Sequence, residues 1–282
     1  MNNIMIQGTT SSAGKSLMCT ALCRIFKEDG YKVYPFKSQN MSSNYYITNE
    51  GHKMAVAQAL QAKAAGLTPH SDMNPILLMP KSHVGSEVVL CGKETGTVEA
   101  SRYFNDRAKL KSLIIEKYKK AERENDLVVI EGAGSPAEIN LKKNDLANMG
   151  MAEIADSPVL LVTDIDRGGA FAALYGTVML LEPEERNRIK GFIINKFRGD
   201  ITLLQSGLKM IEELTNIPVV GVIPYVELEL VDEDSLVDRD KKCNHEEQTS
   251  VEEEEELTKL AKTVRDNLDM DYIYKLVGGV NG

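Results

Sequence analysis

The chain of 282 residues has only four cysteines, four histidines and no tryptophan. The cysteines, Cys19, Cys23, Cys91 and Cys243, form no CxxC pair, which argues against a structural zinc site and against a disulfide framework. Cys19 and Cys23 lie four residues apart on an expected helix, where burial on one face is the simpler interpretation. No signal peptide and no run of 18 apolar residues occurs. We therefore expect a soluble, cytoplasmic protein without a membrane segment.

Basic residues are outnumbered, with 33 lysines and arginines against 42 aspartates and glutamates. The formal net charge is −9, and the stretch from Glu227 to Glu256 holds fourteen acidic residues but only three basic ones. No basic groove that could follow a nucleic-acid backbone is visible, so we expect no nucleic-acid partner. We predict a folded domain at 1–225, a solvated acidic linker at 226–250 and a C-terminal helix and tail at 251–282.

The last segment has apolar residues at helical spacing. The stripe consists of Leu257, Leu260, Ala261, Val264 and Leu268. We expect a helix that docks on the core or on a partner.

Short apolar runs recur through the first 225 residues, with helical segments between them. Continuous apolar runs are typical of strands that are covered on both faces. Their alternation with helices predicts an α/β fold in which a mostly parallel sheet has helices on both faces and ligands bind at the carboxyl ends of the strands. The runs are Ile4–Ile6, Val33–Phe36, Val88–Leu90, Leu127–Ile130, Val159–Val162, Phe192–Ile194 and Val219–Ile223.

The stretch IQGTTSSAGKS follows the first of these runs and precedes a helical pattern. Its glycines allow the backbone amides to point inward, and the positive end of the helix dipole faces the same hollow, which favours an anion. Five residues rather than the usual four separate Gly8 from Gly14, and a turn without ligand is the alternative. We predict a P-loop in which Lys15 reaches the β- and γ-phosphates of ATP and the Ser16 hydroxyl binds Mg²⁺. Its predicted nucleotide-binding residues are Gly8, Thr9, Thr10, Ser12, Ala13, Gly14, Lys15 and Ser16.

Other polar residues follow the strands directly. Glu131 comes after LVVI and is the predicted second ligand of Mg²⁺, although it could instead pair with a neighbouring lysine. Lys37 ends the second strand and is predicted to offset charge at the γ-phosphate, the alternative being a surface lysine. Asn195 and Lys196, in INKFRGD, are predicted to contact the nucleotide, while Lys196 with Asp200 could equally form a surface ion pair.

Several longer stretches of the sequence form one combined pattern. They are GTTSSAGKS, PFKSQNMSSN, DMNPILL, EGAGSPAEINL, DLANMG, DIDRGGAFAALYGT and GFIINKFRGD. Together they resemble cobyric acid synthase, a family of glutamine-dependent amidating enzymes of cobalamin biosynthesis. The resemblance covers Met1 to about Asp238 and is much more specific than any single motif.

The resemblance implies a P-loop core like that of dethiobiotin synthetase. It implies a ligase that phosphorylates carboxylates of a corrinoid, cobyrinic acid a,c-diamide, and lets ammonia displace the phosphate. Asp145, in DLANMG, matches a family position near the substrate or its acyl-phosphate, the alternative being a helix cap. The candidate substrate-binding residues are Gln39, Asn40, Asn44 and Asn140.

The chain departs from the family pattern in several places. Family members continue into a glutaminase domain, and we expect ammonia here to come from solution or from a separate glutaminase subunit. Lys53 stands where an acidic metal ligand is expected, and Val56 and Met79 replace an arginine and a lysine. These changes leave the nucleotide loop intact but weaken the reacting centre.

Three functions remain open at this stage. The first is an ATP-dependent carbon–nitrogen ligase of the cobyric acid synthase type. The second is a catalytically weakened nucleotide-binding paralogue that acts through a partner or by binding a corrinoid. The third is a carboxylase like dethiobiotin synthetase, and the fold alone does not choose among them. Domains of this kind often pair through helices beside the loop, so a homodimer is a further expectation.

Overall fold

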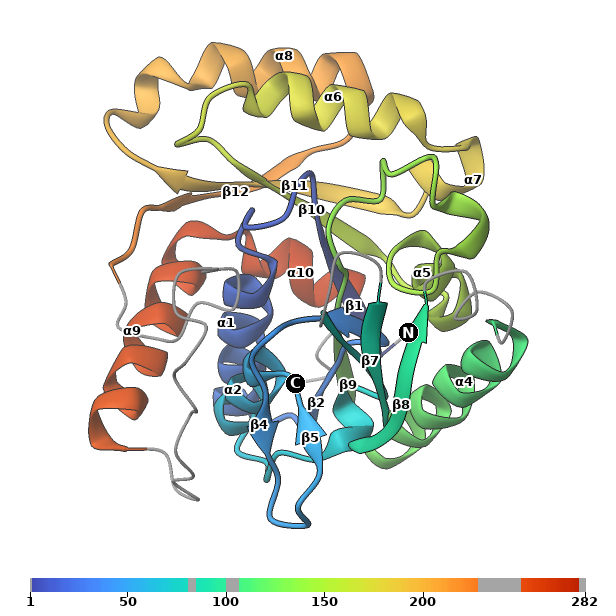
Figure 1. Ribbon diagram of the computed structural model, residues 1–282. Coiled ribbons are helices and arrows are strands. Elements are labelled where there is room, and N and C mark those ends of the chain that lie inside the picture. The colour runs from blue at the N-terminus through green and yellow to red at the C-terminus, as the bar shows by residue number, and fades with distance from the viewer. Residues whose placement is uncertain (1, 81–84, 100–106, 228–249, 279–282) are drawn as a thin grey trace.

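The computed structural model describes residues 2–80, 85–99, 107–227 and 250–278. Within them a six-stranded sheet has the order β12-β11-β10-β1-β9-β2, and all neighbouring strands are parallel. This confirms the predicted parallel sheet, whose middle strand β1 lies between β9 and β10 (Figure 1). The strands are β1 Asn3–Gly8, β2 Val33–Phe36, β9 Leu127–Glu131, β10 Val159–Asp164, β11 Ile189–Phe197 and β12 Val219–Pro224.

Helices cover both faces of this sheet. Ile4 and Ile6 of β1 belong to one apolar cluster and Met5 belongs to another, because successive side chains of a strand point to opposite faces. The first cluster includes α1 (Lys15–Glu28), α9 (Val251–Asn267) and α10 (Met270–Leu276). The second includes α4 (Arg107–Glu124), α5 (Met149–Ala155), α6 (Ala170–Leu180) and α8 (Gln205–Thr215). The other helices in the described ranges are α2 (Val56–Ala64), α7 (Pro183–Arg186) and short 3-10 turns at Ser71–Met73, Lys142–Asn144 and Ile201–Leu203.

A smaller sheet stands beside the main one. It has the order β3-β6-β7-β8, and a separate two-stranded ribbon pairs β4 with β5. The run Val88–Leu90, counted in the sequence with the parallel strands, lies in this smaller sheet, so that expectation is wrong. Cys91 and Gly92 both have positive φ in the two-residue connection between β7 and β8, and such a turn makes its strands antiparallel. The bounds are β3 Gln39–Met41, β4 Tyr46–Ile47, β5 Lys53–Met54, β6 Ile76–Pro80, β7 Gly85–Leu90 and β8 Lys93–Glu99.

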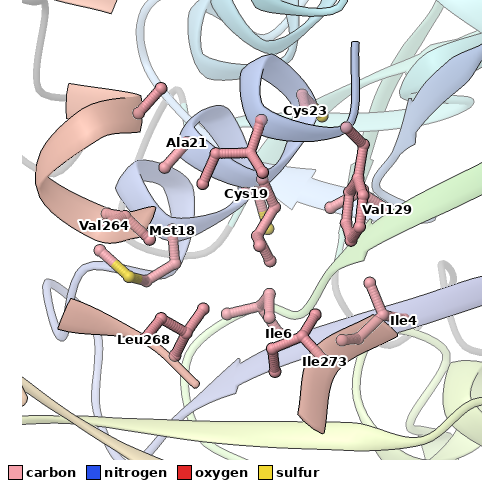
Figure 2. Close-up of a cluster of buried hydrophobic side chains, with 14 of the residues drawn as sticks. Ile4, Ile6, Met18, Cys19, Ala21, Cys23, Val129, Val264, Leu268 and Ile273 are labelled. Atoms are coloured by element: carbon pink, nitrogen blue, oxygen red, sulfur yellow. The ribbon is translucent and has the colours of Figure 1, made fainter. Parts of the chain in front are cut away.

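The C-terminal helix docks on the core, one of its two expected positions. All five residues of the predicted stripe are at most 6% exposed, and Val264 and Leu268 lie close to Met18 of α1 in Figure 2. Ser250 caps α9 by accepting a hydrogen bond from the Glu253 amide at 3.1 Å. The stripe therefore closes the apolar cluster on the α1 face of the sheet.

Cys19 and Cys23 are fully buried and free, as expected for packing residues. Burial raises the pKa of both thiols, so neither ionises readily. Cys243 lies outside the described residues. In the described part of the chain no helix combines the length and the apolar character needed to cross a bilayer.

We predict that Leu260→Ala lowers the free energy of unfolding by about 2–5 kcal/mol, because it removes a fully buried side chain and leaves a cavity. Urea denaturation followed by circular dichroism would measure the loss. Lys262→Ala, on the exposed side of the same helix, is the control and should change stability by about 0.5 kcal/mol or less. Equal effects of the two variants would mean that the tail does not contribute to the core.

Candidate functional site

The strand register brings the predicted P-loop, Lys37 and Glu131 to one edge of the sheet. Ile6 of β1 is the partner of Glu131 on β9, and Phe36 of β2 is the partner of Ile130. The loop after Gly8, the Glu131 side chain and Lys37 therefore meet at the carboxyl ends of adjacent parallel strands. This is the edge at which open α/β sheets bind ligands.

The predicted P-loop joins β1 to α1 in a tight wrap. Gly14 precedes α1 with φ 101°, and Ser12 has φ 57°. Lys15 is 6% exposed, and its Nζ donates to the Thr10 carbonyl at 3.1 Å. A Cβ at Gly8 would lie 2.9 Å from that carbonyl and 3.1 Å from the Lys15 side chain. The loop thus folds over its own lysine at the amino end of a helix, an arrangement that favours an anion.

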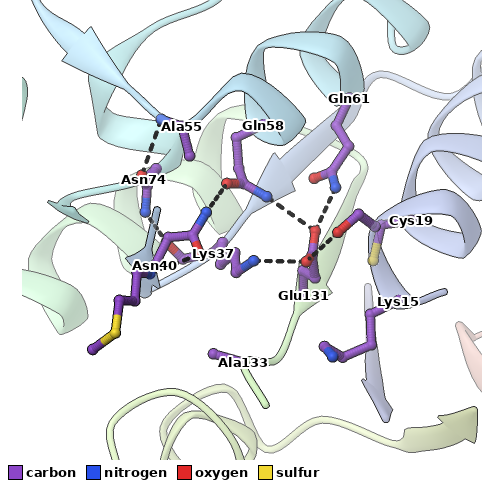
Figure 3. A network of polar contacts seen from close by, with 12 residues as sticks. Lys15, Cys19, Lys37, Asn40, Ala55, Gln58, Gln61, Asn74, Glu131 and Ala133 are labelled. Atoms are coloured by element: carbon purple, nitrogen blue, oxygen red, sulfur yellow. Dashed lines mark hydrogen bonds and ion pairs between the residues drawn. The ribbon is translucent and has the colours of Figure 1, made fainter. Parts of the chain in front are cut away.

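Glu131 is the centre of a buried polar network (Figure 3). Its Oε1 lies 2.7 Å from Lys37 Nζ and accepts a hydrogen bond from Ser16 Oγ at 2.8 Å. Its Oε2 accepts from Gln58 Nε2 at 3.0 Å and from Gln61 Nε2 at 2.5 Å. Glu131 and Lys37 are only 1% and 4% exposed, so the pair needs these partners to offset the loss of hydration.

Two asparagine side chains, one on β3 and one just before β6, support this network. Asn40 Nδ2 donates to Gln58 Oε1 at 3.1 Å, and Asn74 Nδ2 donates to the Lys37 carbonyl at 3.1 Å. Asn74 Oδ1 in turn accepts from the Ala55 amide at the start of α2. The segment after β2 and helix α2 are therefore fixed to each other beside the carboxylate.

Asn195 and Lys196 lie against the P-loop. Asn195 Nδ2 donates to the Ala13 carbonyl at 3.0 Å, and a Cβ at Gly14 would fall 2.0 Å from that nitrogen. Lys196 Nζ donates to the Ser12 carbonyl at 2.8 Å and pairs with Asp164 at 2.9 Å. Both side chains come from β11, which β10 separates from β1 in the sheet, and they bind the backbone of the P-loop.

The alternative pairing of Lys196 with Asp200 is wrong. Asp200 caps the short turn Ile201–Leu203, accepting from the Thr202 amide at 2.9 Å and from its hydroxyl at 2.8 Å. The backbone hydrogen bond from Thr202 lowers the pKa of this carboxyl. Lys196 pairs with Asp164 instead, because β10 and β11 are neighbouring strands and Asp164 lies opposite Asn195, the residue before Lys196.

Asp145 makes the contacts of a helix cap. Its carboxylate accepts from the amides of Ala147, Asn148 and Gly150 at 2.9, 2.8 and 2.9 Å, at the start of α5. Asn148 then exchanges two hydrogen bonds with the backbone of Ala133, one residue beyond Gly132. The DLANMG motif therefore fixes the loop that follows Glu131, and a contact of Asp145 with substrate stays a prediction.

The predicted substrate residues are spread over two regions. Asn40 joins the Glu131 network, and Gln39 lies partly buried on the same strand, β3. Asn44 lies in the loop before β4, where its amide donates to Ser42 Oγ. Asn140 is exposed in the turns after Ser135. No hydrogen bond joins Asn44 or Asn140 to Glu131 in the part of the chain that the structure describes.

Sequence reasoning missed Gln58, Gln61 and Asn148, and it did not assign Asp164. A signal for the glutamines exists, because they lie three residues apart in VAQALQAKA, a helix otherwise rich in alanine. Both are fully buried, and two buried amides on one apolar helix face indicate a polar partner across from them. The identity of that partner depends on a residue about 70 positions further along the chain.

The three residues that depart from the family pattern have acidic or apolar neighbours. Lys53 pairs with Glu94 of β8, and its ammonium stands 4.4 Å from the centre of the Tyr45 ring. Val56 and Met79 are buried in separate apolar clusters. Neither valine nor methionine can offer a phosphate or a carboxylate the positive charge that an arginine or a lysine would.

Oxygen atoms suited to a hard cation meet at Ser16 and Glu131. Adjacent ligands of an octahedral Mg²⁺ lie about 2.9 Å apart when each is 2.0–2.1 Å from the ion. Ser16 Oγ and Glu131 Oε1 are 2.8 Å apart and fit that spacing. No group of three or more His, Cys, Asp or Glu side chains suited to a metal occurs among the described residues. The arrangement suits a cation held by one carboxylate, one hydroxyl and ligand phosphates.

Comparison with known proteins agrees with this geometry. A family model described as "CobQ/CobB/MinD/ParA nucleotide binding domain" matches residues 4–237. Cobyric acid synthase from Alkaliphilus metalliredigens is 59% identical over 243 residues, 86% of this chain and 48% of that protein. Those from Lachnoclostridium phytofermentans and Clostridium acetobutylicum are 58% and 56% identical, over 84% and 86% of this chain and 47% and 50% of each relative. The chain thus spans about half the length of these curated relatives.

We predict that Lys37→Met lowers the free energy of unfolding by about 3–5 kcal/mol, because it leaves the buried Glu131 carboxylate without a counter-charge. The double variant Lys37→Met with Glu131→Gln should recover more than half of that loss, since the uncompensated charge is then gone. Equilibrium urea unfolding at pH 7 would measure both. A loss below about 1 kcal/mol for Lys37→Met, typical of an exposed ion pair, would contradict the buried pair.

Proposed function

Because the chain belongs to the CobQ/CobB/MinD/ParA nucleotide binding domain family, we propose that it binds ATP and amidates corrinoid carboxylates, converting cobyrinic acid a,c-diamide to cobyric acid in cobalamin biosynthesis. One observation carries the proposal. The P-loop and the Lys37–Glu131–Ser16 cluster occur together in a chain that is 56–59% identical to cobyric acid synthases. Those relatives point to the corrinoid, and the cluster supports phosphoryl transfer.

The proposed chemistry has two steps. A carboxylate oxygen of the corrinoid attacks the γ-phosphorus of ATP, the bond to ADP breaks, and an acyl-phosphate forms. Ammonia then attacks the acyl carbon, phosphate leaves with the bonding electrons, and a proton is lost from nitrogen to give the amide. Two anions meet in the first step, so cations are needed there, and Lys15 and Lys37 are the proposed sources.

Ser16 and Glu131 are the proposed ligands of Mg²⁺, which would neutralise phosphate charge when bound with the nucleotide. Gly8, Gly14 and the intervening amides would hold the phosphates. Asn195 and Lys196 would fix the loop from behind, through the carbonyls of Ala13 and Ser12. Gln39, Asn40, Asn44, Asn140 and Asp145 remain the proposed contacts for the corrinoid.

Ammonia is proposed to come from solution or from a separate glutaminase. The proposed place of action is the cytoplasm, because the reaction consumes ATP. A homodimer stays a prediction.

A second candidate function is a nucleotide-binding paralogue with little catalytic power, acting through a partner or by binding a corrinoid. One observation favours it. Lys53 is neutralised by Glu94, and Val56 and Met79 are buried among apolar side chains. Valine and methionine cannot present the positive charge that would attract a substrate rich in carboxylates, and a lysine cannot act as the expected acidic ligand of Mg²⁺.

The test measures ADP release by the purified chain with ATP, Mg²⁺, ammonium chloride and cobyrinic acid a,c-diamide. We expect ADP release that depends on the corrinoid, and mass spectrometry should find an amidated product whose mass is slightly lower for each carboxylate converted, because NH₂ replaces OH. Lys15→Ala should reduce the rate by at least about 100-fold, because it removes a cation from the transferring phosphoryl group. Reactions without the corrinoid are the control.

Nucleotide binding without corrinoid-dependent ADP release would contradict the ligase and support the second candidate. In that case Lys53→Glu combined with Met79→Lys, which restores the charges of the family pattern, should produce turnover if the chain is a decayed ligase. Failure to bind ATP in any condition would contradict both functions.

A further inference from the structure

Two glutamines of α2 bind the same oxygen atom of Glu131. Gln58 Nε2 and Gln61 Nε2 donate to Oε2 at 3.0 and 2.5 Å, while Oε1 receives Lys37 and Ser16. The two glutamines are three residues apart, so they lie one above the other on the helix. The two oxygens of the carboxylate therefore have different surroundings (Figure 3). Oε2 accepts from two neutral amides, whereas Oε1 faces the ammonium of Lys37 and the hydroxyl of Ser16 in the first turn of α1.

The direction of these hydrogen bonds is set by the carboxylate. An ionised carboxylate paired with a lysine can only accept, so both glutamines must turn their NH₂ groups toward it. The Gln58 carbonyl oxygen then faces the other way and accepts from Asn40 Nδ2 at 3.1 Å. Gln58 thereby connects strand β3 of the smaller sheet to Glu131 of the main sheet.

Packing alone gives no reason for amides at these positions. The neighbouring residues of α2 are largely alanines, and both glutamine side chains are fully buried. Leucine or methionine would fill the same space without the cost of burying an amide. The Oε1 atom of Gln61 even lacks a hydrogen-bond partner among the described residues. The hydrogen bonds of the two glutamines to Glu131 Oε2 offset this cost.

We propose that Gln58 and Gln61 are positioning residues that hold Oε2 of Glu131, so that Oε1 stays directed at Ser16 and serves as a single-oxygen ligand of Mg²⁺. Without them the carboxylate can rotate and offer both oxygens to Lys37. The inference rests on the proposed magnesium–nucleotide site but not on the corrinoid or on amide formation.

The experiment titrates Mg²⁺ into the purified chain with a fluorescent ATP analogue, and it repeats the nucleotide titration in EDTA. For Gln58→Met and for Gln61→Met we expect the Mg²⁺ concentration at half-maximal binding to rise by about tenfold, as for other residues that orient a metal ligand. Affinity in EDTA should stay within about twofold of wild type, since the glutamines do not touch the P-loop amides.

Gln7→Met is the matched control. Gln7 is also fully buried, but among the described residues its Nε2 donates to the sulfur atoms of Met5 and Met149, at 3.4 and 3.9 Å, and not to Glu131. It should leave the Mg²⁺ dependence unchanged. Thermal melting of every variant shows whether it is folded, and Gln58→Met and Gln61→Met each test the proposal if the other does not fold.

Wild-type Mg²⁺ dependence in both glutamine variants would overturn the inference and leave the metal site standing. Equal loss of affinity with and without Mg²⁺ would also overturn it, because that result indicates a general distortion of the site. If the unmodified chain binds the ATP analogue equally well with and without Mg²⁺, the proposed metal site is overturned and this inference with it. None of these results depends on corrinoid turnover, which tests the proposed function separately.

Discussion

The burial of one carboxylate beside one lysine at the edge of a parallel sheet constrains the whole site. A charge at the position of Glu131, only 1% exposed, is stable when every nearby donor is turned toward it. The donors come from the strand next to β9, from the first turn of α1 and from α2, which lie far apart in the sequence. The polar network therefore ties the phosphate loop, the second strand and α2 into one unit.

The sequence was a good guide wherever a local pattern determines structure. The apolar run before GTTSSAGKS, the glycines and the Lys-Ser pair define strand, loop and helix without help from distant residues. Lys37 and Glu131 follow the same logic, since each directly ends a strand and parallel strands end at a common edge. The alternative interpretation of Glu131 as a lysine partner also describes a contact that is present, because Lys37 is that lysine.

Residues whose role depends on a distant partner were harder to predict. The role of Gln58 and Gln61 depends on the packing of α2 beside the end of β9, which the local sequence does not reveal. The ion pair of Asp164 with Lys196 likewise depends on β10 and β11 being neighbours in the sheet. The misplaced run Val88–Leu90 has the same origin. Its apolar character is compatible with either sheet, and the two-residue turn at Cys91 decides the pairing.

Lys53 and Met79, two of the residues that depart from the family pattern, contact side chains other than Glu131 and its partners in the described part of the chain. Lys53 interacts with Glu94 and Tyr45, and Met79 packs with Leu77 and Val89, all in the β3–β8 region of the chain rather than at the P-loop. Glu131 keeps its four donors without any contribution from them. The hydrogen bonds and the ion pair of Glu131 therefore do not depend on the side chains of Lys53 or Met79. Asn40, a proposed contact of the corrinoid, donates to Gln58, and Gln58 donates to Glu131, so the proposed substrate and metal sites are joined by a short hydrogen-bonded path.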